Sequence, residues 1–151
     1  MNRTPDHTTD LRDRPGLEQP SGLREFRSRL SSDELKRSLD EQGIRCFVLD
    51  LRGVSGKAAL LEAWGESVEV PQWVGRNWDA MDEAVRDLSW ARAERYVVIV
   101  TGGGELASVE PKSWQMTLDI LRTGVAEWET RGVPMLVLVR GVRLSSDEVR
   151  G

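Results

Sequence analysis

Three short apolar segments alternate with amphipathic segments along this chain, and this alternation is the feature that most restricts its fold. The apolar segments span residues 46–51, 96–101 and 133–139, and a glycine follows each within two residues. Helical periodicity fills the intervals, most clearly over residues 111–131. Strands that alternate with helices are joined by right-handed crossovers into a parallel sheet. The sequence therefore predicts an α/β domain over residues 46–140, with a small three-stranded parallel sheet packed with helices.

The residues that precede this domain divide into a tail and an extension. Residues 1–22 are polar and contain three prolines, so we expect a tail that buries little. Residues 23–45 are expected to form a helical N-terminal extension. After the last apolar segment, residues 141–151 are polar and are expected to form a C-terminal tail.

Two patterns predict the helices of the extension. Leu23, Phe26 and Leu30 have the spacing of one helix face. Ser31 and Glu34 have the spacing of a capping box, in which each side chain accepts a hydrogen bond from the other residue's backbone N–H. A second helix is therefore expected to begin after Ser31.

The composition excludes several classes of function. The chain has 151 residues, one His (His7) and one Cys (Cys46), too few for a Cys/His zinc site, a disulfide or a His-dependent nucleophile. A net charge of −4 argues against direct binding of nucleic acid. We therefore expect no catalytic activity, no cofactor and no metal.

The location expected from the sequence is the cytoplasm. The first 19 residues lack the apolar core of a signal peptide, and no apolar run is long enough to cross a bilayer. A single cysteine, expected here to be a small buried apolar residue, also fits a reducing compartment.

The segment 78–89 predicts an amphipathic helix with an acidic outer face. At 100° per residue, its apolar residues gather on one side and five charged residues on the opposite arc: Asp79, Asp82, Glu83, Arg86 and Asp87. Residues 62–94 contain eight acidic and three basic side chains. The simplest interpretation is a solvated surface, but acids four residues apart repel one another. Two large aromatics, Trp73 and Trp78, also flank this face, which favours a surface that docks onto a cationic partner.

The stretch 71–88, PQWVGRNWDAMDEAVRDL, resembles the signature segment of the barstar family of intracellular inhibitors of secreted ribonucleases. The likeness rests on an aromatic, Gly75, Asn77, an apolar residue, Asp79 and Ala80, with an acid four residues after Asp79. It extends over the three predicted strands and the helix that ends at Gly132.

This resemblance implies a mode of action and a set of contact residues. Members of the family block the active site of a ribonuclease with an acidic helix and the loop that precedes it. The residues matched to partner contacts are Trp73, Gly75, Asn77, Trp78, Asp79, Asp82, Glu83 and Glu127. The expected partner is a cognate extracellular ribonuclease or toxin with a basic active site.

Simple chemistry agrees with this implication. A ribonuclease holds phosphoryl oxygens with cationic side chains, and a fixed carboxylate offers them charge and bidentate geometry without a bond to cleave. Two departures from the family are visible. Glu83 stands where the family usually has Asp and reaches about 1.5 Å further, and Asp82 stands where the best-known member has an aromatic. Both indicate a partner other than barnase itself.

A second function from another class is also compatible with the sequence. The same scaffold could serve as a protein-interaction or regulatory module whose partner is not a nuclease, with the N-terminal extension binding elsewhere. The presence of a secreted nuclease gene beside this one would favour the inhibitor.

Overall fold

A computed structural model describes residues 21–144 of the chain. Four parallel strands form one sheet: β1 (Gly22–Glu25), β2 (Arg45–Asp50), β3 (Tyr96–Thr101) and β4 (Met135–Arg140). Their order across the sheet is β1-β4-β3-β2. The predicted α/β class and parallel sheet are confirmed, but the sheet has four strands and not three.

The additional strand lies where a helix was predicted. Gly22–Glu25 pairs with β4, and Leu23 lies opposite Val137. The helical spacing of Leu23 and Phe26 has another cause, because Leu23 is buried on one face of the sheet and Phe26, which follows the strand, is buried on the other. The predicted helix over Leu23–Leu30 is therefore wrong. Of the expected tails 1–22 and 141–151, residues 1–20 and 145–151 lie outside the described residues.

The second helix of the predicted extension is present as α1 (Ser32–Glu41). Its capping box is complete: the Ser31 hydroxyl accepts a hydrogen bond from the Glu34 N–H at 3.0 Å, and the Glu34 carboxylate accepts one from the Ser31 N–H at 2.8 Å. The hydrogen bond from the Ser31 backbone N–H to the Glu34 carboxylate favours its ionised form and holds the pKa of Glu34 below its ordinary value. The sequence pattern therefore located the start of α1 correctly.

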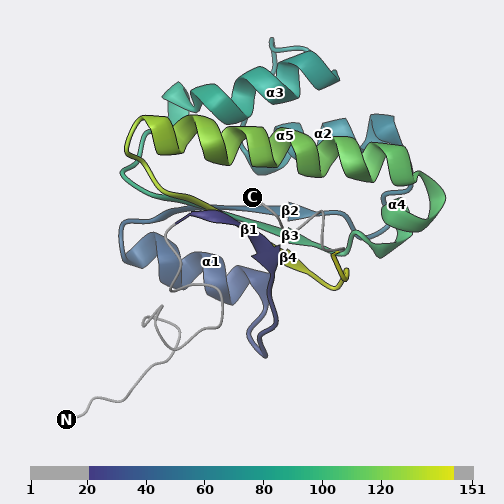
Figure 1. Cartoon of the computed structure of the whole chain (residues 1–151), viewed down its shortest axis with the longest axis horizontal. Coiled ribbons are helices and arrows are strands. Elements are labelled where there is room, and N and C mark those ends of the chain that lie inside the picture. Colours follow the sequence, from purple (N-terminus) through teal and green to yellow (C-terminus); the bar gives the residue numbers. More distant parts are fainter. Residues whose placement is uncertain (1–20, 145–151) are drawn as a thin grey trace.

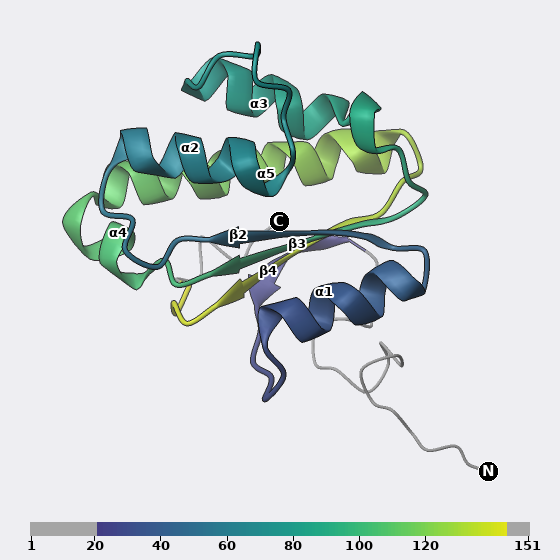
Figure 2. The ribbon, with the colours of Figure 1, turned by 180° about the vertical axis from the view of Figure 1, so that it is seen from behind.

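Helices cover the two faces of the sheet unequally. The face opposite α1 is covered by α2 (Lys57–Ser67) and α5 (Pro111–Thr130), and α3 (Trp78–Asp87) lies outermost on them (Figures 1 and 2). Of the helices within residues 21–144, only α1 covers the other face. A short helix, α4 (Gly104–Val109), precedes α5, and a 3₁₀ helix, η3 (Ser89–Ala91), follows α3. None of the helices within residues 21–144 is long and apolar enough to span a bilayer.

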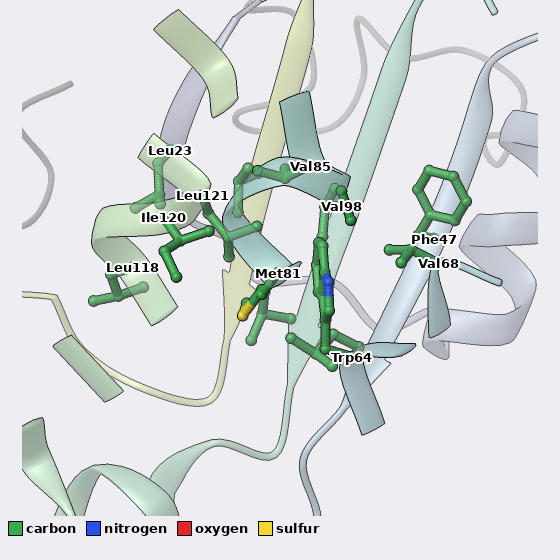
Figure 3. Close-up of a cluster of buried hydrophobic side chains, with 14 of the residues drawn as sticks. Leu23, Phe47, Trp64, Val68, Met81, Val85, Val98, Leu118, Ile120 and Leu121 are labelled. Atoms are coloured by element: carbon green, nitrogen blue, oxygen red, sulfur yellow. The ribbon is translucent and has the colours of Figure 1, made fainter. Parts of the chain in front are cut away.

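The larger core lies between the sheet and the helices α2, α3 and α5. Met81 and Val85 of α3 point into it beside Leu121 and Val98, and Trp64 of α2 lies in the same cluster (Figure 3). On the other face, Leu35 and Leu39 of α1 pack on a smaller cluster. The candidate site lies on the side of the sheet that has the larger core, where α2, α3 and α5 pack.

Candidate protein-binding site

The loop before α3 is held in place by its own polar side chains. Asn77 is the N-cap of α3, and its side-chain oxygen accepts a hydrogen bond from the Ala80 N–H at 2.8 Å. Arg76 donates to the Val74 carbonyl oxygen at 3.0 Å, and its guanidinium lies so close to Gly65 of α2 that a side chain there would collide with it. The loop is thus anchored to α2, while Asn77 and Gly75 remain exposed.

The two tryptophans of this segment differ in exposure. Trp73 is 85% exposed, more than either of the other exposed large apolar residues within residues 21–144, Val109 and Met116. Trp78 is only partly buried against the core, and the Lys57 ammonium lies 5.7 Å from its ring centroid. Trp73 is therefore free to contact a partner, whereas Trp78 also stabilises the base of α3.

The orientation of α3 is fixed by α5. Trp128 donates its indole N–H to the carbonyl oxygen of Val85 at 2.7 Å, and both residues are buried. Gly124 faces Val85 so closely that an added Cβ would lie 2.7 Å from a methyl carbon. The buried face is Met81, Ala84 and Val85, as the periodicity predicted, so the acidic arc faces outward.

The carboxylates of this surface fall into two sets. Asp82 forms an ion pair with Arg86 at 2.8 Å, and Glu127 of α5 forms one with Arg131 at 3.0 Å. We call Asp82 and Glu127 the paired acids. Within residues 21–144, neither the Asp79 nor the Glu83 carboxylate accepts a hydrogen bond or forms an ion pair. We call Asp79 and Glu83 the unpaired acids.

Arg86 interacts electrostatically with acidic side chains of both α3 and α5. The Asp82 carboxylate is the main reason that the pKa of Arg86 is raised above its ordinary value, and Glu127 and Glu83 add smaller contributions. Glu127 of α5 is therefore near the acidic face of α3, and the structure brings the sequence-predicted acids onto one surface.

A groove beside Glu83 was not foreseen from the sequence. It has a volume of about 550 Å³ and lies between Trp73 on the loop and Trp90 of η3. Leu88, between α3 and η3, adopts the left-handed backbone conformation (φ 48°), which Leu rarely occupies. That unusual turn brings Trp90 back beside α3, and no sequence signal marks it.

A larger cavity, about 940 Å³, lies elsewhere, beside α1 and the edge of the sheet formed by β2. Several of its charged side chains already have partners within the chain, as in the pairs Asp50–Arg52 and Arg45–Glu69. Arg140 donates to the Ser32 hydroxyl and to the Leu30 carbonyl. With these groups satisfied, the cavity offers less to a ligand than the acidic surface does.

Two observations on the described residues concern metal binding and thiol chemistry. Residues 21–144 contain no group of three or more His, Cys, Asp or Glu side chains that could hold a metal ion. Cys46 is fully buried, as expected, and burial raises the pKa of its thiol to about 12, so the reactive thiolate is scarce. His7 lies outside the described residues.

The sequence model of one protein family, Barstar (barnase inhibitor), matches residues 44–140. The matched range begins just before β2 and ends with β4, and it includes the loop, α3 and Glu127. β1 and α1 precede it, although both are part of the same folded unit. No curated protein matches the chain.

Proposed function

This chain belongs to the barstar family, and on that premise we propose that it is a non-catalytic, immunity-type inhibitor of a secreted ribonuclease. It acts in the cytoplasm, where it blocks the cationic active site of its cognate enzyme with α3 and the loop before it. The observation that carries the proposal is the exposed, unpaired state of Asp79 and Glu83 on a rigidly held helix.

The unpaired acids suit a phosphate-binding pocket. Each carboxylate presents two oxygens to the Arg, Lys or His side chains that otherwise hold a phosphodiester. Because α3 is braced by α5 and Asn77, its backbone has little conformational entropy to lose on binding. The carboxylates cannot be cleaved, so the complex blocks the enzyme instead of turning over.

The loop extends the contact surface. Trp73 supplies an exposed aromatic ring beside the acids, and Gly75 and Asn77 keep the backbone between them accessible. Asp82, Glu127 and Trp78 lie around this centre, where contacts with the partner would be weaker because each already interacts within the chain. The interface therefore has a centre of unpaired acids and a rim of paired groups.

The test is inhibition of RNA cleavage by a panel of barnase-type ribonucleases, including barnase, at increasing ratios of purified chain. We expect stoichiometric inhibition of at least one enzyme, with weaker inhibition of barnase because Glu83 and Asp82 depart from the family pattern. Binding of a non-nuclease partner without inhibition of any ribonuclease in the panel would contradict the proposal and favour an interaction module.

A further inference from the structure

The loop before α3, residues 68–77, contains one basic residue, Arg76, three positions before the unpaired acid Asp79. Residues three positions apart have Cα atoms at most about 11 Å from each other, a distance that the two extended side chains can bridge. Even so, Arg76 forms no ion pair with any acid in the part of the chain that the structure describes. Something other than distance along the chain therefore keeps this cation from Asp79.

The Arg76 guanidinium lies on α2 instead. A Cβ added to Gly65 would lie 2.5 Å from the Cζ of Arg76 and 2.8 Å from one of its terminal nitrogens. The other terminal nitrogen donates to the Val74 carbonyl oxygen at 3.0 Å, and the side chain as a whole is half-buried. The guanidinium thus occupies the space that a side chain at position 65 would fill, which we call the Gly65 notch.

The Gly65 notch is closely packed. The free space left between α2, the loop and α3 is about 10 Å³, the size of one water molecule, and Gly65, Arg76 and Asn77 are among the residues that line it. Gly65 is buried inside α2, where glycine stabilises a helix less than Ala does. The position of the guanidinium gives this helix-interior glycine a physical reason.

We propose that the Gly65 notch holds the Arg76 guanidinium away from Asp79 and so keeps that acid available to a partner. Gly65 is then a positioning residue, which acts through Arg76 from outside the contact surface. The proposal rests on the proposed function, because it concerns one of the acids that bind the ribonuclease there. The shape of the loop does not depend on the cation alone, since Val74 donates its backbone N–H to the Pro71 carbonyl oxygen at 3.0 Å and Asn77 caps α3.

The test uses four variants of the full chain. Gly65→Ala fills the notch and displaces Arg76, and because only the end of a flexible side chain has to move, we expect it to fold. Arg76→Gln removes the charge but keeps an N–H donor for the Val74 carbonyl, and it is made alone and together with Gly65→Ala. Gly104→Ala, at the first residue of α4, is the matched control, because nothing lies within 4 Å of the added Cβ.

The first measurement needs no partner. The side-chain carboxyl carbon resonance of Asp79 is followed by NMR at neutral pH and low salt. We expect it to move in Gly65→Ala, where the displaced cation pairs with Asp79, and to return in the double variant. It should stay in place in Arg76→Gln and in Gly104→Ala.

The second measurement is the Kd for a ribonuclease of the panel that the wild-type chain inhibits. Gly65→Ala should bind about threefold more weakly, as expected when an exposed ion pair has to be broken first. The double variant should bind as the wild type does, and so should each of the other two variants. Recovery on removal of the charge distinguishes the displaced cation from simple damage to α2.

Each other outcome overturns the assignment. An unmoved Asp79 resonance in Gly65→Ala would show that the cation does not reach this acid, and a much lower melting temperature would show that the notch cannot release Arg76. Weaker binding of Arg76→Gln alone would make Arg76 itself the determinant. If the resonance moves as expected and no ribonuclease is inhibited, the proposed function fails and the role of the notch stands. If an enzyme is inhibited and the resonance is unmoved, only the role of the notch fails.

Discussion

The two sets of acids on this surface have similar chemistry but different neighbours four residues further along the chain. Asp82 is followed at that spacing by Arg86, and Glu127 by Arg131, and both pairs are formed. Asp79 is followed at that spacing by Glu83, and Glu83 by Asp87, so neither has a cation four residues later. Arg86, three residues after Glu83, is paired with Asp82. On this surface, the two acids with an arginine four residues later are paired, and the two with an acid at that position remain available to a partner.

This difference has an energetic meaning. An unpaired acid gives up only its hydration when a partner's cation approaches, whereas a paired acid must also share or lose its internal arginine. In the free protein the unpaired acids gain nothing from each other, since like charges one turn apart repel. As a result, α3 is slightly less stable, and the two carboxylates remain unpaired and available to a partner's cation.

Charge reversal at an unpaired acid is expected to have the largest effect. Glu83→Lys removes the central carboxylate and places a cation against the cationic active site, and such like-charge contacts cost several kcal/mol. We expect the Kd for the cognate ribonuclease, measured by titration calorimetry, to rise by about a thousandfold or more. Glu105→Lys on α4 is the matched control and should bind as the wild type does.

Removing the brace between α5 and α3 is expected to destabilise the fold. Trp128→Phe deletes the indole N–H and leaves the buried Val85 carbonyl without that donor, which typically costs about 1–3 kcal/mol. Chemical denaturation should show this loss of stability. If stability is unchanged, the hydrogen bond does not fix α3, and the rigid presentation of Asp79 and Glu83 has another source.

Neutralising the paired acids is expected to change affinity less. Asp82→Asn and Glu127→Gln each remove a half-buried carboxylate that already has an arginine partner, so the loss of binding should be under about 1 kcal/mol. Arg86→Gln frees Asp82 and should speed association at low salt, because the surface becomes more negative. Slower association of Arg86→Gln in stopped-flow measurements would show that Arg86 itself contacts the partner.

The smallest effects concern the stability of the free protein. Glu83→Ala should raise the free energy of unfolding by a few tenths of a kcal/mol, because it relieves repulsion from Asp79 and Asp87. Asp79 lies in the first turn of α3, where a negative charge interacts well with the helix dipole, so Asp79→Ala should lower it by a similar amount. Opposite signs in thermal melts would confirm this distinction, and equal signs would contradict it.

Much of the fold followed from local patterns. The apolar runs of β2, β3 and β4, the capping box of α1 and the buried stripe of α3 depend on neighbouring residues, so the sequence predicts them well. β1 could not be found in this way, because its four residues are stabilised by pairing with β4 more than 110 residues later. Leu23 and Phe26 fit a helix face as well as they fit the two sides of a sheet.

The site was predictable to a similar degree. The helix phase predicted which acids point outward, and the i+4 rule predicts which of them are paired. The groove was not predictable, because it depends on a left-handed Leu88 and on the hydrogen bond between Trp90 and Val68, which are 22 residues apart. Tertiary contacts of this kind leave no periodic trace in the sequence.

The central claim is that the unpaired acids dominate binding and that neither is needed for folding. Its most direct test is an alanine scan of Asp79, Asp82, Glu83 and Asp87, with dissociation rates from the cognate ribonuclease and thermal melts measured on the same samples. We expect Asp79→Ala and Glu83→Ala to lose about 2–5 kcal/mol of binding through faster dissociation, Asp82→Ala to lose under about 1 kcal/mol, and all four to melt close to the wild type. Wild-type dissociation of Glu83→Ala together with fast dissociation of Asp82→Ala, or a much lower melting temperature of Glu83→Ala, would contradict the account.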